Sequence, residues 1–267
     1  MLGKLLKHEF RYYAKRFVPF IAIIMAVAVV LWIMTMTTGS ENIYEMLYNN
    51  MDESDIFYVV GNLLMYVLSV AVSVLSIYVF YVGISRFEKN LFSDEGYLLN
   101  TLPVTSSQLI LSKLIGAVAC WIVCSIVSTV ASGLIYGFEE AESLSMLWAS
   151  FSMMGDGIED ETALVVLNYV YEFITYCAFM LLCYMCQSIR NRLASRRGMA
   201  IFIGFAFLII NVIIISFIMG FVYGAEADTG EYYSNALLIV MLIYYVLVSA
   251  VMFAVTNSNM KNHLNLE

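Results

Sequence analysis

The sequence has little charge, little proline and almost no histidine. Only 13% of its 267 residues are charged and 62% are apolar, whereas a soluble domain carries about 25% charged residues. This balance excludes a soluble globular domain, and the same arithmetic excludes a disordered chain, a disulfide scaffold and a fibrous protein. The composition instead predicts an all-α, polytopic membrane protein.

The motifs of several enzyme classes are also missing. There is no G-x-x-x-x-G-K-[ST] sequence, so the chain does not bind ATP phosphates through a P-loop. The two histidines, His8 and His263, lie near the termini, where they cannot serve an intramembrane metalloprotease, a Ser–His protease or a haem site. The Cys183-x-x-Cys186 pair lies in an apolar run and is interpreted as small packing residues. Catalysis by this chain alone is not expected.

What the sequence does contain is long apolar runs. A helix needs about 20 mainly apolar residues to cross about 30 Å of hydrocarbon. Six runs meet this requirement and predict one membrane domain over residues 1–267. The six predicted spans are 17–38, 56–85, 109–136, 163–189, 199–223 and 234–256.

The charges between the spans are segregated by sign. All 13 basic residues lie before the first span, around the loops that follow the second and fourth spans, or after the sixth span. The other three loops carry acidic residues and no basic residue. Because basic residues stay on the inner side of a membrane, both termini and the two basic loops are expected in the cytosol.

The residues before the first span alternate between apolar and basic at helical spacing. This pattern predicts a basic amphipathic helix over residues 1–16, lying along the inner membrane surface. Two roles stay open for it, a plain topological anchor and an elbow helix that couples cytosolic motion to the spans.

The loop between the second and third spans is too polar to cross the membrane and too apolar to be an ordinary solvent loop. Thr105 and Gln108 fit a capping box that opens the third span. Apolar residues around Tyr97 and Leu98 predict either a short cytosolic helix covered by a partner or a re-entrant segment facing lipid. On the opposite side, residues 137–162 predict a short helix at the outer interface.

The spans contain a single acidic side chain, Glu172, whose insertion costs about 2.5–3.5 kcal/mol unless it faces protein or water. Asn168 falls on the same helical face. In the second span Asn62, Ser69 and Ser73 form a polar stripe. These residues predict either packing between helices or the wall of a translocation pathway, and function is favoured for Glu172 because its cost needs a compensating reason.

The loop after the second span carries a resemblance to a known family. The segments Arg86-Phe, Asp94-Glu-Gly-Tyr-Leu and Thr101-Leu-Pro-Val-Thr-Ser-Ser-Gln108 resemble the cytosolic loop of six-span permease subunits of type-2 ABC exporters from Firmicutes. The opening Leu5-Leu-Lys-His-Glu-Phe-Arg11 is also similar to the start of these proteins. In that family the loop docks on the ATPase as a coupling helix. The resemblance gives this role to Asp94, Glu95, Gly96, Tyr97, Leu98 and Leu99, and to Thr101, Leu102 and Pro103.

The resemblance implies a permease subunit of an ATP-driven exporter in a bacterial cytoplasmic membrane. It implies cytosolic ATPase subunits that hold ATP and Mg²⁺, a second permease chain in a homo- or heterodimer, contact with membrane lipid, and no nucleic acid. An amphipathic, peptide-like or lipid-like substrate is expected. A non-transport scaffold or signalling subunit is the alternative, and a secondary transporter would require inverted repeats and more buried charges.

Overall fold

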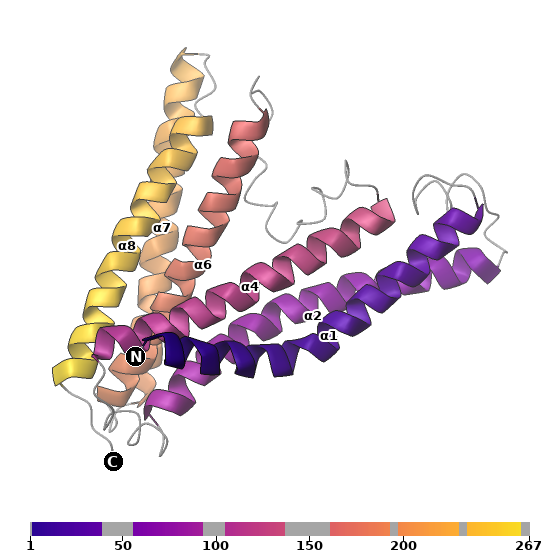
Figure 1. Ribbon diagram of the computed structural model, residues 1–267. Helices are drawn as coiled ribbons and strands as arrows, with labels where there is room; N and C mark the ends of the chain where they lie inside the picture. Colours follow the sequence, from indigo (N-terminus) through magenta and orange to yellow (C-terminus); the bar gives the residue numbers. More distant parts are fainter. Residues whose placement is uncertain are drawn as a thin grey trace. The chain divides into compact units, whose positions relative to one another are not determined.

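A computed structural model describes residues 2–38, 56–92, 105–136, 161–192, 197–229 and 234–262. Its helices are α1 (Leu2–Thr38), α2 (Ile56–Phe92), α4 (Ser106–Tyr136), α6 (Glu161–Arg192), α7 (Arg197–Thr229) and α8 (Ser234–Asn262), drawn in Figure 1. These described residues form no β-strand. Within the described residues, six helices are long and apolar enough to span a membrane, which confirms the predicted all-α fold and a multi-pass membrane protein.

The six predicted spans each fall inside one helix, but the helices are longer than the apolar runs. α2 has 37 residues, or about 55 Å at about 1.5 Å per residue, against about 30 Å of hydrocarbon. α2 is therefore longer than a perpendicular crossing of the hydrocarbon requires. The outer segment 137–160 lies outside the described residues, so its predicted short helix stays a prediction.

The N-terminal region differs from the expected division at residues 16 and 17. The amphipathic segment and the first span form one continuous helix, α1, with Pro19 inside it. Figure 1 shows that α1 (indigo) bends part-way along its length. A proline inside a helix removes one backbone hydrogen bond, so Pro19 lets the helix bend without ending it.

Part of the apolar face of the first half of α1 packs on protein. Tyr13 and Phe17 are almost fully buried. The ring centroid of Tyr78 on α2 lies 5.3 Å from that of Phe17 and 5.4 Å from that of Phe20. Such ring pairs stabilise a contact beyond the area they bury. This part of the amphipathic face, expected to rest on the membrane surface, is used for contact between helices.

The chain divides into two compact units. The first contains residues 1–2, 82–118 and 152–267, and the second contains residues 3–81 and 119–151. In the first unit, α6 lies against both α7 and α8. α2 and α4 each contribute residues to both units.

Within the first unit, α2, α4 and α6 approach closely at Gly83. A Cβ atom on Gly83 would lie 2.5 Å from the Met180 methyl carbon and 3.3 Å from the Ala117 Cβ. One turn away on α6, the Tyr176 hydroxyl donates a hydrogen bond to the Ala117 carbonyl at 3.3 Å. Small residues let membrane helices approach in this way, and the approach fixes the distance between three helices.

We expect Gly83→Leu to separate these helices and to destabilise the fold by about 1–3 kcal/mol, because a well-packed interior does not accept extra carbon atoms. Gly83→Ala should cost less, since the nearest atom is the end of a flexible methionine. The matched control is Gly220→Leu on α7, where a Cβ meets nothing within 4 Å. Unfolding in mixed detergent micelles measures all three, and equal losses for Leu at positions 83 and 220 would contradict the prediction.

Candidate functional site at the base of the 93–104 segment

The segment 93–104 is bordered by α2 and by the capped start of α4. The backbone N–H of Thr105 donates to Gln108 Oε1 at 3.4 Å, and the N–H of Gln108 donates to Thr105 Oγ1 at 3.4 Å. The N–H of Leu109 donates to the Thr105 carbonyl at 3.2 Å, which begins the helical ladder. This reciprocal pair confirms the predicted capping box and fixes where the segment ends.

Fully buried apolar side chains lie near the helix ends on both sides of this segment. We call the following residues the loop base: Phe87, Leu91, Leu109, Ile110 and Tyr184. The rings of Phe87 on α2 and Tyr184 on α6 stack with their centroids 3.9 Å apart and their planes 10° apart. The end of α2 is therefore fixed to α6 by an aromatic contact that water does not reach.

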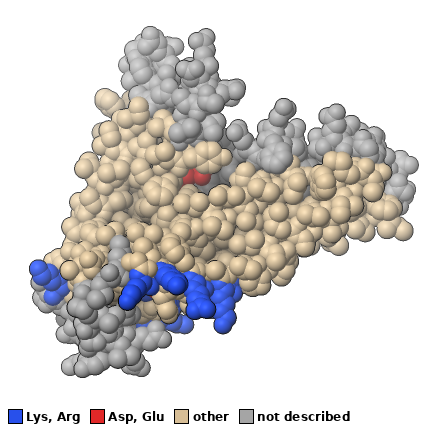
Figure 2. Space-filling model, in the orientation of Figure 1, with Lys and Arg blue, Asp and Glu red and all other residues tan. Residues whose placement is uncertain are grey.

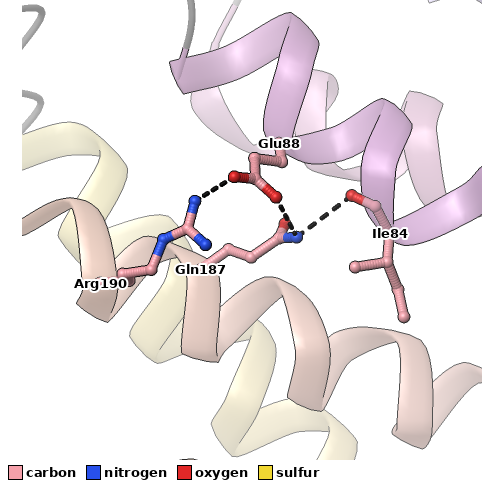
Figure 3. Close-up of polar contacts among 4 residues, drawn as sticks. All are labelled: Ile84, Glu88, Gln187 and Arg190. Atoms are coloured by element: carbon pink, nitrogen blue, oxygen red, sulfur yellow. Dashed lines mark hydrogen bonds and ion pairs between the residues drawn. The ribbon is translucent and has the colours of Figure 1, made fainter. Parts of the chain in front are cut away.

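A polar bridge links the same two helices beside the loop base (Figure 3). The Gln187 amide nitrogen donates to the Ile84 carbonyl at 3.2 Å and to Glu88 Oε2 at 3.4 Å. The Arg190 guanidinium forms an ion pair with Glu88 Oε1. Glu88 thus contacts two side chains of α6, through an ion pair with Arg190 and a directional hydrogen bond from Gln187.

Buried polar side chains are concentrated around the loop base. They are Asn90, Ser112, Lys113, Gln187 and Ser188. Among the described residues, Asn90 Oδ1, Gln187 Oε1 and Ser188 Oγ have no hydrogen-bond partner. A buried polar atom without a partner costs about 1–3 kcal/mol. These polar side chains lie next to the ends of the 93–104 segment, and their concentration there marks the region as a candidate functional site.

We expect charge reversal to test the polar bridge. Glu88→Arg and Arg190→Glu should each destabilise the contact between α2 and α6, and the double exchange should restore most of the loss. Since the two side chains are 38% and 42% exposed, the coupling energy should be only about 0.2–1 kcal/mol. A double-mutant cycle of unfolding in detergent measures it, and additive losses would show that the ion pair contributes nothing.

The residues that the family resemblance assigns to ATPase coupling all lie outside the described residues. They are Asp94, Glu95, Gly96, Tyr97, Leu98, Leu99, Thr101, Leu102 and Pro103. Their role stays a prediction, and so does the choice between a covered cytosolic helix and a re-entrant segment. The described site is what holds this segment at both ends.

Glu172 lies on α6 in the first unit, and its side chain is half-buried. Because α6 is helical throughout, Asn168, Glu172 and Thr175 share one face, as the spacing predicts. Within the part of the chain that the structure describes, no hydrogen bond or ion pair involves the Glu172 carboxylate. The two pathway candidates on α6 are thus brought together.

The polar stripe of α2 belongs to the second unit and satisfies itself locally. Asn62 donates to the Tyr58 carbonyl, and Ser69 donates to the Tyr66 carbonyl. Ser73 donates to the Ser69 carbonyl. Hydroxyl groups bonded to their own helix need no water-filled path, so this geometry agrees with the packing interpretation of the stripe.

An apolar groove of about 290 Å³ lies between α2, α6 and α7 in the first unit. Cys183, Cys186, Gln187 and Gly204 are among the residues that line it. A Cβ at Gly204 would lie 2.9 Å from Cys186 Sγ, so the thiol packs closely on α7. Cys186 therefore acts as a small packing residue, as the sequence indicates.

Two polar contacts in this unit were not predicted from the sequence. Glu88 is an acidic residue between the basic residues Arg86 and Lys89. A single negative charge in a basic segment is the sequence feature that could have indicated an ion pair. Asn211 on α7 accepts a hydrogen bond from the Tyr244 hydroxyl of α8 at 2.5 Å. A single amide in an apolar span requires such a partner. The sequence therefore indicates that Asn211 has a hydrogen-bond partner, but it does not identify Tyr244 as that partner.

Comparison with known proteins finds no protein-family model, no curated protein and no solved structure that matches the chain.

Proposed function

We propose that the chain is the membrane-spanning permease subunit of an ATP-driven ABC exporter in a bacterial cytoplasmic membrane, with both termini in the cytosol. ATP and Mg²⁺ are held by separate cytosolic ATPase subunits, and two permease chains pair as a homo- or heterodimer. The transported substrate is amphipathic, peptide-like or lipid-like. The family resemblance of residues 86–113 supports this proposal.

The observation that carries the proposal is the way in which the 93–104 segment is anchored. A segment that transmits force from a soluble ATPase to the spans must be held firmly at both ends. The capping box fixes one end, at Thr105, while the Phe87–Tyr184 stack and the Glu88 bridge tie the other end to α6. A push on the segment would therefore reach α2, α4 and α6 directly.

A non-transport scaffold or signalling subunit is the competing function. Such a protein would also have six spans, but it would have no need for an apolar inner segment that is bordered by a capped helix and by a helix end tied to α6. A soluble P-loop ATPase encoded beside this chain would favour the exporter.

Purification of the full chain from its native membrane in a mild detergent tests the proposal. We expect a P-loop ATPase without membrane-spanning helices and a second six-span chain to co-purify. Cross-linking in the native membrane should give a dimer of permease chains. If the ATPase is expressed in the same cells and only a monomer without ATPase is recovered, the proposed function is wrong.

Within this proposal, Glu172 lines the pathway. We expect Glu172→Gln to leave expression and assembly intact and to alter transport or substrate-stimulated ATPase activity, because it keeps the size and hydrogen bonding but removes the charge. Asn168→Ala on the same face is a companion variant that leaves the carboxylate in place. A packing role has the opposite signature, in which Gln is tolerated and Glu172→Leu damages folding. If Glu172→Gln transports as well as the wild type, Glu172 has a structural role only and does not line the pathway.

A further inference from the structure

The first half of α1 carries a row of basic side chains opposite its packed face. Lys4, Lys7, Arg11 and Lys15 follow one another at intervals of three or four residues, so they lie on one face of the helix. All four are exposed, and none forms a hydrogen bond or ion pair with another described residue. Figure 2 shows blue side chains over the N-terminal half of α1 and tan beyond it.

The same row becomes apolar further along the helix. Val18 continues the line after Lys15 and is 59% exposed, and Val29, Ile33 and Met36 extend it along the span. One continuous face is therefore basic first and apolar afterwards. A soluble protein or a nucleic acid would match only the first part, whereas a phospholipid leaflet presents phosphate beside hydrocarbon and matches both.

The border between the two parts has the residues typical of a membrane interface. The Arg16 guanidinium lies 5.6 Å from the centroid of the Tyr12 ring and donates a hydrogen bond to its hydroxyl. Tyrosine and arginine are common at the level of lipid headgroups, because one end of each side chain is apolar and the other is polar. This pair places the headgroup layer close to residues 12–16.

We infer that the basic face of α1 binds the phosphate groups of anionic phospholipids, with the apolar continuation of the face in contact with their acyl chains. The binding does not depend on an ATPase or on the transported substrate. Each neutralised Lys or Arg beside an anionic surface should weaken the attraction by about fivefold. The interaction should also fall with salt, because exposed charges are screened within about 10 Å at 0.1 M.

Binding of a fluorescent phosphatidylglycerol to the full chain in uncharged detergent micelles tests the inference. The wild type should bind phosphatidylglycerol more tightly than phosphatidylcholine, and more weakly at 500 mM than at about 50 mM salt. The variant K4Q/K7Q/R11Q/K15Q should bind phosphatidylglycerol at least about tenfold more weakly. The exchange K4R/K7R/R11K/K15R keeps the charge and should bind within about twofold of the wild type.

Further measurements distinguish a phospholipid from a free phosphate compound as the ligand, and α1 from other basic segments as the binding site. Glycerophosphate alone should not compete, because it lacks the chains that the apolar continuation contacts. The control R192Q/R196Q/R197Q/K261Q removes as many charges elsewhere and should retain binding. If the quadruple α1 variant fails to insert, K4Q/K7Q and R11Q/K15Q are measured separately, each with a partial loss expected. Equal binding of phosphatidylcholine, full competition by glycerophosphate, or loss in the control alone would overturn the inference.

Discussion

Replacement of Phe87 by Ala is expected to lower the free energy of unfolding by about 3–5 kcal/mol, the usual cost of removing a buried phenyl ring. Phe87 has no exposed surface, and its ring stacks on Tyr184, which is equally buried. The loss should be near the upper end of that range because the contact joins two helices that are far apart in sequence. Unfolding of the purified chain in mixed detergent micelles measures the effect.

Phe57→Ala is the matched control, because the same side chain is removed from the same helix. Phe57 lies near the other end of α2 and is 60% exposed, so its ring is in contact with the surroundings rather than with protein. We expect Phe57→Ala to change stability by well under about 1 kcal/mol. A Phe87→Ala loss no larger than that of Phe57→Ala would show that the loop base is not a packed anchor.

The parts of the fold that sequence predicted well are those set by local chemistry. A span is recognised by its length and apolar composition alone, and all six predicted spans lie in the six helices. The capping box at Thr105 and Gln108 is equally local, because both partners lie within one turn. Periodicity likewise placed Asn168 and Glu172 on one face of α6.

The parts that sequence did not predict depend on which helices meet. Glu88 and Gln187 are 99 residues apart, and neither residue type indicates the other as its partner. The apolar face of α1 shows the same limit. Protein and lipid are equally apolar neighbours, so the pattern at Tyr13 and Phe17 could not distinguish contact with Tyr78 from contact with a membrane.

The second large effect is expected in the coupling segment, and it rests on the proposed function. Replacement of both Tyr97 and Leu98 by Asp should abolish most transport and most of the permease-dependent ATPase activity, while six-span insertion is unchanged. Two carboxylates would be buried at an apolar docking surface, where an unpaired charge costs several kcal/mol. ATPase turnover in proteoliposomes and co-purification of the ATPase are the measurements.

A control for this variant adds two negative charges, one within the segment and one at its border with α4, without removing apolar side chains. Asn100→Asp with Thr105→Asp does so, because residue 100 is already polar and aspartate is a good N-cap for α4. The control should keep the ATPase bound, so that a loss in the Tyr97 and Leu98 variant is due to the docking surface and not to net charge. If that variant instead retains normal transport and normal co-purification, residues 93–104 are not the coupling helix. The apolar side chains of the segment would then have to be explained by contact with lipid, as a re-entrant segment requires.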